Sequence, residues 1–114
     1  MQSTSVIRAL AALAQEHRLA AFRLLVQAGP QGMAAGAIAE RLGLPASSLS
    51  FHLAQLTHAG LVTSERHGRS IVYHADYTAM DGLLAYLTEN CCGGIPCAEA
   101  TKCPPLTQPS KDVA

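Results

Sequence analysis

The amino-acid sequence predicts a mainly helical domain that carries one β-hairpin near its C-terminal end. Apolar residues recur at helical spacing along most of residues 6–59, alternate with polar residues after Gly60, and return to helical spacing over residues 78–90. The chain has 114 residues, 49% of them hydrophobic and 14% charged, which is enough for one modest core. The expected order is four helices, two strands and a fifth helix.

The first two predicted helices are amphipathic. The first has one apolar stripe, formed by Val6, Ile7, Leu10, Leu13 and Ala14. The second is expected from about Glu16 to Gln27, and its inward side is formed by Leu19, Phe22, Leu25 and Val26. It ends at Gly29 and Pro30, because glycine fits a left-handed cap and proline cannot continue a helix.

A pair of helices separated by a short break follows. Residues 34–42 predict a short helix that Gly43, Leu44 and Pro45 interrupt. Residues 46–59 predict a second helix whose apolar side is formed by Leu49, Leu53 and Leu56. Gly60 then takes the left-handed position after the helix, where Leu61 can fold back against it.

Two strands and a last helix complete the domain. The pattern after Gly60 predicts a strand in LVTSER, a tight turn in HGR and a second strand in SIVYHAD. Gly68 supplies the positive φ of the turn. The last helix, residues 78–90, has one apolar stripe, formed by Met80, Leu83, Leu84 and Leu87. Thr78 and Asp81 form a weak variant of the capping box. Residues 1–90 are therefore expected to be the folded domain, and residues 91–114 a flexible tail without regular structure.

The helix, break, helix and hairpin together are typical of a winged helix-turn-helix, which places its second helix in the major groove of DNA. The polar side of that helix carries hydroxyl, imidazole and amide groups that can reach bases and phosphates; they belong to Ser47, Ser48, Ser50, His52 and Gln55. The hairpin tip is basic and carries Arg66, His67 and Arg69. The alternative is an amphipathic helix and a hairpin in an unrelated α+β domain.

The charge distribution favours DNA binding by the first part of the chain. The net charge is zero, but residues 1–74 hold six arginines against three glutamates, and residues 75–114 have an excess of acidic residues. No apolar stretch is long enough to span a bilayer, and no basic region precedes the first apolar stripe. We therefore expect a cytoplasmic protein with no membrane segment.

Two runs resemble the ArsR/SmtB family of metal-responsive repressors, over about residues 5–90. They are EHRLAAFRLLVQAG and IAERLGLPASSLSFHLAQLTHAGLVTSERHGRSIVYH. The resemblance implies a winged-helix homodimer that leaves its double-stranded operator when a metal or metalloid ion, or another signal, binds. It also implies a dimer interface built from the first and last helices, through Ile7, Leu10, Leu13, Leu83, Leu84 and Leu87.

Four cysteines lie within thirteen residues: Cys91, Cys92, Cys97 and Cys103. The chain lacks the paired cysteines of one arsenic-sensing design, which would lie in residues 33–42, and the last-helix histidines of the zinc-sensing design. TENCCGGIPC instead resembles a subgroup of arsenic repressors with adjacent cysteines after the last helix and a third several residues on. The resemblance implies trivalent arsenic or antimony as inducer, held by Cys91, Cys92 and Cys97. Thiolates select such soft ions.

Other roles for the thiols stay open at this stage. Cys103 is the alternative third ligand, or a fourth thiolate if the ion is zinc, cadmium or lead. The thiols could form a redox switch, which needs a pair such as Cys92 and Cys97 because a disulfide between adjacent residues is strained. A thiol enzyme such as an arsenate reductase is disfavoured, because no arginine follows any cysteine and a helix C-terminus disfavours thiolate. No organic cofactor is expected.

Overall fold

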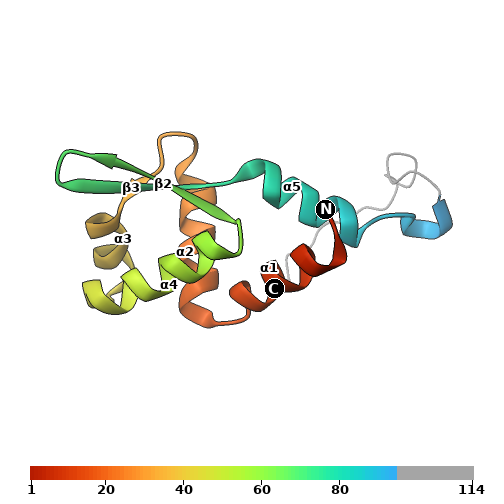
Figure 1. Cartoon of the computed structure of the whole chain (residues 1–114), viewed down its shortest axis with the longest axis horizontal. Coiled ribbons are helices and arrows are strands. Elements are labelled where there is room, and N and C mark those ends of the chain that lie inside the picture. The colour runs from red at the N-terminus through yellow and green to blue at the C-terminus, as the bar shows by residue number, and fades with distance from the viewer. Residues whose placement is uncertain (95–114) are drawn as a thin grey trace. The chain divides into compact units, whose positions relative to one another are not determined.

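The computed structural model describes residues 1–94 and contains the predicted helices and hairpin (Figure 1). The elements are α1 (Ser3–Leu13), α2 (Glu16–Ala28), β1 (Met33–Ala34), α3 (Ala35–Leu42), α4 (Ala46–His58), β2 (Val62–His67), β3 (Ser70–Ala75), α5 (Tyr77–Leu87) and a 3₁₀ turn (Cys91–Gly94). Met1–Leu84 form one compact unit, and residues 85–94 belong to another. The mainly helical fold with a two-stranded wing is therefore confirmed.

The core of the first unit lies between the helices and the base of the hairpin. It contains the three inward leucines of α4, with Leu53 and Leu56 completely buried, together with Leu25 of α2 and Ile38 of α3. The prediction for Leu19 is wrong, because 45% of its surface is exposed. Leu19 instead lines an apolar hollow together with Leu13 and Met80, at the edge of the core.

The sheet has three antiparallel strands in the order β1-β3-β2. Its main part is the predicted hairpin, in which Val62 pairs with Ala75 and His67 with Ser70. The short strand β1 was not predicted, because two residues carry no periodic signal. Gly32 allows β1 to approach β3, since a Cβ there would meet the Tyr73 carbonyl oxygen and the His74 ring, and its φ is +70°.

A continuous set of hydrogen bonds joins the end of α4 to the start of α5. The Leu61 N–H donates to the Leu56 carbonyl (3.1 Å), and Gly60, at φ +81°, donates to Thr57 (3.0 Å). These two bonds define the predicted left-handed cap. The Leu61 carbonyl in turn accepts the Asp76 N–H at 2.8 Å. Leu61 is completely buried at this junction.

The N-terminal cap of α5 differs from the sequence prediction. The helix begins at Tyr77, one residue earlier than expected, and the Asp76 carboxylate accepts the Ala79 N–H at 3.0 Å. Asp76 is thus the capping residue, and the expected pairing of Thr78 with Asp81 is wrong. Within residues 1–94 no helix is both long and apolar enough to cross a membrane.

Candidate nucleic-acid interface and thiol pair

The arrangement of α3 and α4 is that of a helix-turn-helix. Gly43 ends α3 in the left-handed conformation (φ +67°), and the Leu44 N–H donates back to Ala39 at 3.0 Å. Pro45 then starts α4. Because one side of α4 is packed into the core through its leucines, the opposite side faces solvent. The first requirement for a recognition helix is therefore met.

The predicted DNA-contacting residues of α4 fall into two groups. Ser47, Ser48 and Ser50 are exposed, whereas His52 and Gln55 are half-buried. The His52 ring lies 5.6 Å from the ring of His17 on α2, centre to centre. Its Nδ1 atom has no hydrogen-bond partner among the described residues. His52 thus faces the flank of α4 toward α2 rather than the middle of the exposed side.

Burial of the His52 imidazole lowers its pKa, and the positive charges of Arg18 and His17 lower it further. The protein therefore favours the neutral ring at this position. A DNA phosphate close by would favour the charged ring, so the position of DNA relative to His52 affects its protonation.

Sequence reasoning missed Phe51, which is 58% exposed. It lies two residues from both Leu49 and Leu53, and helical geometry places such a residue on the opposite side from that stripe. The signal was present in the sequence, since a phenylalanine out of register with the apolar stripe must lie on the polar side.

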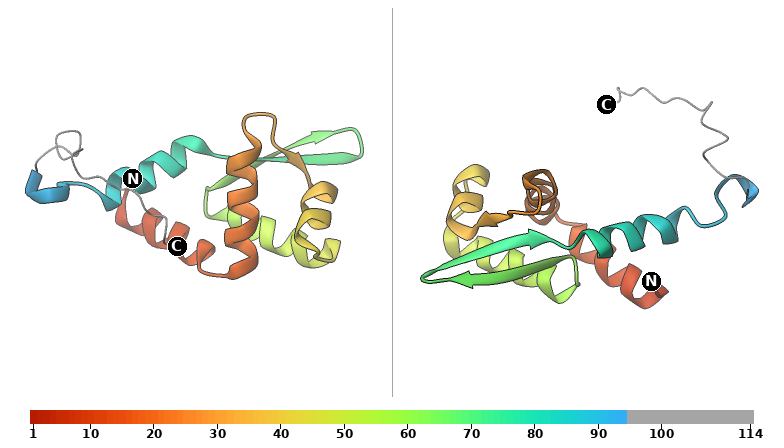
Figure 2. Two further views of the ribbon diagram at one scale, coloured as in Figure 1. Left: turned by 180° about the vertical axis from the view of Figure 1, so that it is seen from behind. Right: turned by 90° about the horizontal axis from the view of Figure 1, so that it is seen from above.

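The wing is a ribbon that extends beyond the helices (Figure 2). Arg66, His67 and Arg69 are all exposed in or beside its tip, as predicted. The turn contains Gly68 at φ +63°. Two cationic side chains at the end of a projecting ribbon can contact the phosphates that flank a groove.

A carboxylate on the wing lies between two imidazoles. Glu65 Oε1 is 3.3 Å from His67 Nε2 and 3.4 Å from His74 Nε2. The hydrogen bond and the charge of His67, followed by the interaction with His74, lower the pKa of the Glu65 carboxyl. The His74 Nδ1–H donates to the Pro30 carbonyl at 3.0 Å, because a carbonyl can only accept. His74 thereby joins the base of the wing to the loop after α2.

A basic hollow of about 410 Å³ lies beside the C-terminal half of α4. Its polar lining includes Arg8, Arg18, Gln55 and His58. The Arg18 Nε–H donates to the Ala12 carbonyl at 2.6 Å, which fixes the guanidinium group in place. The two arginines extend the positive surface beyond the residues predicted from the sequence.

The residues expected at a dimer interface are mostly exposed. Ile7 (65%) and Leu10 (41%) of α1 are exposed, as is Leu84 (53%) of α5. Leu87 is exposed in the second unit, Leu13 is half-buried, and Leu83 is buried in the core of this chain.

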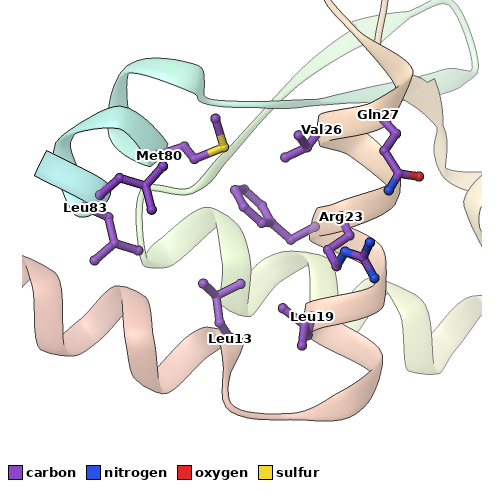
Figure 3. A pocket seen from close by; sticks show the side chains of 9 residues that line it. Leu13, Leu19, Arg23, Val26, Gln27, Met80 and Leu83 are labelled. Carbon is purple, nitrogen blue, oxygen red and sulfur yellow. The ribbon is translucent and has the colours of Figure 1, made fainter. Parts of the chain in front are cut away.

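An apolar hollow of about 280 Å³ lies among α1, α2 and α5 (Figure 3). Leu13, Leu19, Met80 and Leu83 line it, and Arg23 and Gln27 contribute polar groups from α2. Apolar surface of this kind on α1 and α5 fits a contact with a second copy.

The two adjacent thiols lie close together in the second unit. Cys91 Sγ and Cys92 Sγ are 3.6 Å apart. The distance is far longer than an S–S bond of about 2.05 Å. Asn90 (φ 57°) and Cys92 (φ 59°) adopt left-handed conformations. These conformations turn the chain sharply, whereas adjacent side chains in an extended chain point to opposite sides.

The spacing of the two sulfurs fits a shared soft ion. Two sulfurs held at about 2.3 Å from one ion, at roughly tetrahedral angles, lie about 3.5–3.8 Å apart. Within residues 1–94 no group of three or more His, Cys, Asp or Glu side chains could hold a metal ion. A three-sulfur site therefore needs a ligand from the remaining chain, where the predicted ligands Cys97 and Cys103 lie outside the described residues.

The helix, left-handed break, recognition helix and projecting ribbon define a winged helix-turn-helix protein. A family model described as a helix-turn-helix domain matches residues 13–65. The nodulation protein NolR of Rhizobium meliloti is 35% identical over 80 residues, which are 70% of this chain and 63% of that protein. This chain thus spans less than two thirds of that relative.

Solved structures give the same assignment. The homodimeric winged helix-turn-helix DNA-binding domain Mb0332 of Mycobacterium bovis, described as a possible ArsR-family transcriptional regulator, is 30% identical with a TM-score of 0.61. The alignment covers 76% of this chain and 81% of that chain. A structure described as a "possible transcriptional regulator for arsenical resistance" is 26% identical, with a TM-score of 0.60 and coverage of 82% and 91%. The chain belongs to the ArsR family of winged-helix transcriptional regulators, which are not enzymes.

Proposed function

We propose that the protein is a homodimeric repressor that binds operator DNA and releases it when trivalent arsenic or antimony binds a three-cysteine site. Cys91 and Cys92 supply two sulfurs, and Cys97 supplies the third, with Cys103 as the alternative. The 3.6 Å separation of the two adjacent sulfurs supports a shared thiophilic ion. The choice of arsenic or antimony is supported by the resemblance of TENCCGGIPC to arsenic repressors and by the similarity to a possible transcriptional regulator for arsenical resistance. Thiolates select soft ions of this kind.

DNA binding is supported by the exposed side of α4 and the basic wing. The serines at 47, 48 and 50 present hydroxyl groups beside the groove, and Arg66 and Arg69 can neutralise phosphates. Mb0332, to which this chain is similar, is described as a homodimeric DNA-binding domain. A dimer presents two recognition helices, which fits a site made of two half-sites.

Self-association is supported by the exposed apolar residues of α1 and α5. Replacing both Ile7 and Leu10 by lysine introduces like charges on the α1 surface and should convert dimer to monomer in sedimentation equilibrium. Thr63→Lys, an exposed change on β2, is the matched control and should leave the dimer intact. A dimer that survives the double substitution would show that α1 is outside the interface.

The inducer is tested by titrating one complex in parallel with arsenite, antimonite, zinc, cadmium and peroxide. The probe is a duplex selected from random DNA by the purified protein, and the readout is fluorescence anisotropy. Arsenite and antimonite should weaken binding about 5- to 150-fold, the usual range of coupling between two sites. Release by zinc or cadmium alone would favour a four-thiolate metal sensor.

Variants separate the roles of the thiols. The double variant Cys91→Ser, Cys92→Ser should bind the duplex normally and ignore arsenite. Cys97→Ser should also lose the response, whereas Cys103→Ser is the matched control if Cys97 is the third ligand. Release of the double variant by arsenite would refute the site. Release of the wild type by peroxide, with a disulfide detected by mass spectrometry, would favour a redox switch instead.

A further inference from the structure

We propose that Phe51 recognises the C5-methyl group of a thymine in the major groove of the operator. The inference rests on the proposed DNA-binding function and adds a base preference to it. The observation behind it is that the Phe51 ring is exposed on the side of α4 that faces away from the core. That side is free to enter a groove.

The position of Phe51 is unusual for its chemistry. More than half of its surface is exposed, 58%, on a helix whose leucines at 49, 53 and 56 are almost completely buried. Its exposed neighbours Ser47, Ser48 and Ser50 are small and polar. The ring is therefore the largest group on this side of the helix, and the short serines leave it standing above its surroundings.

The orientation of the ring is restricted by a neighbour. The rings of Phe51 and His52 lie 5.7 Å apart at 65°, in an edge-to-face arrangement. His52 is in turn packed beside His17 of α2. Edge-to-face contacts of this kind are favourable. The contact limits the side-chain freedom that Phe51 would lose on binding, which lowers the entropic cost of using it for recognition.

The chemistry of the groove selects one partner for this ring. A phenyl group has no hydrogen-bonding atom, so it cannot recognise the donors and acceptors of base edges. Thymine alone of the four bases presents a methyl group in the major groove, and apolar side chains contact it. The serines beside Phe51 can satisfy phosphates or base edges around the contact. An apolar group at the centre of a polar recognition surface thus fits a thymine methyl.

The experiment replaces each thymine of the selected duplex by deoxyuridine, one position per half-site at a time. Uracil keeps the pairing edge of thymine and lacks only the methyl group. Removing a buried methyl costs about fourfold in affinity, so replacement in both half-sites should weaken wild-type binding about 16-fold. Phe51→Ala should bind the thymine and uracil duplexes equally, and Phe51→Leu should keep part of the discrimination.

Thr57→Ala is the matched control on the same helix, because the Thr57 hydroxyl donates to the Leu53 carbonyl within α4. It should discriminate thymine from uracil as the wild type does. Circular dichroism of each variant checks that α4 remains folded, which is expected since Phe51 is largely exposed.

The outcomes distinguish failure of the Phe51 assignment from failure of DNA binding itself. Wild-type affinity that is unchanged by uracil at every position, or selected half-sites without thymine, would overturn the role of Phe51. Undiminished discrimination by Phe51→Ala would assign the methyl contact to another residue and also overturn it. If wild-type protein selects no duplex, DNA binding itself is refuted, and the assignment of Phe51 is refuted with it.

Discussion

Substituting Gly32 by alanine tests how the wing is attached to the body of the protein. Gly32 lies just before β1, and a Cβ there would meet both the Tyr73 carbonyl oxygen and the His74 ring of β3. Because one of these neighbours is backbone, the added methyl cannot be accommodated by a side-chain rotation alone. β1 must therefore move away from β3, and the His74 ring must also leave its position near Pro30.

The expected cost has two parts. A left-handed φ costs an alanine about 1–2 kcal/mol. Loss of the 3.0 Å hydrogen bond from His74 to the Pro30 carbonyl adds about 1 kcal/mol. Displacement of β1 adds to these, so Gly32→Ala should lower the free energy of unfolding by about 2–4 kcal/mol.

Gly43→Ala is the matched control. Gly43 is also left-handed, at φ +67°, but a Cβ there would meet nothing within 4 Å. It should therefore cost only the conformational part, about 1–2 kcal/mol. Urea unfolding followed by circular dichroism, at one protein concentration because a dimer is expected, measures both variants. Equal losses for Gly32→Ala and Gly43→Ala would refute the close approach of β1 to β3.

Three further predictions follow from the core, from His52 and from the wing. Leu53→Ala should lower the free energy of unfolding by about 2–5 kcal/mol in urea denaturation, because the side chain is fully buried, whereas Ala54→Ser on the exposed side should change it little. The folded-state pKa of His52 lies below the unfolded value of 6.5, because its ring is partly buried and because the charges of Arg18 and His17 lie nearby. The unfolded chain therefore takes up the proton first as the pH falls. Its contribution to stability should be complete above about pH 6.5 and decrease as the pH falls through the folded pKa, and His52→Gln should remove this part of the pH dependence of the urea midpoint. Arg66→Ala should weaken binding to all duplexes alike and, because a dimer loses two such contacts, reduce the slope of log affinity against log salt by about 1.8, whereas Arg23→Ala on α2 should leave that slope unchanged.

Local sequence signals were sufficient for most of the fold. The stripe of α4 and the glycine at 60 predict both the helix and its left-handed cap, because these features depend on neighbours in sequence. Strand β1 could not be predicted in this way, since it exists only through its pairing with Tyr73 and Val72 of β3. The capping role of Asp76 was missed because the apolar spacing places the start of α5 one residue too late.

The candidate site was predicted less completely. The exposed serines and the basic wing follow from composition and helical geometry. The position of His52 does not, because it depends on contact with His17 of another helix. The spacing of the two thiols also depends on left-handed conformations at Asn90 and Cys92. Asparagine is enriched in this conformation but cysteine is not, so the residue types alone do not predict the turn.

The hydrogen bonds through Leu61 have a mechanical consequence. The end of α4 is bonded to Leu61, Leu61 to Asp76, and the Asp76 side chain to the first turn of α5. These bonds hold the end of α4, the base of the hairpin and the first turn of α5 together within the first unit. Rotation of the first turn of α5 would therefore require the end of α4 to move with it, or these hydrogen bonds to break.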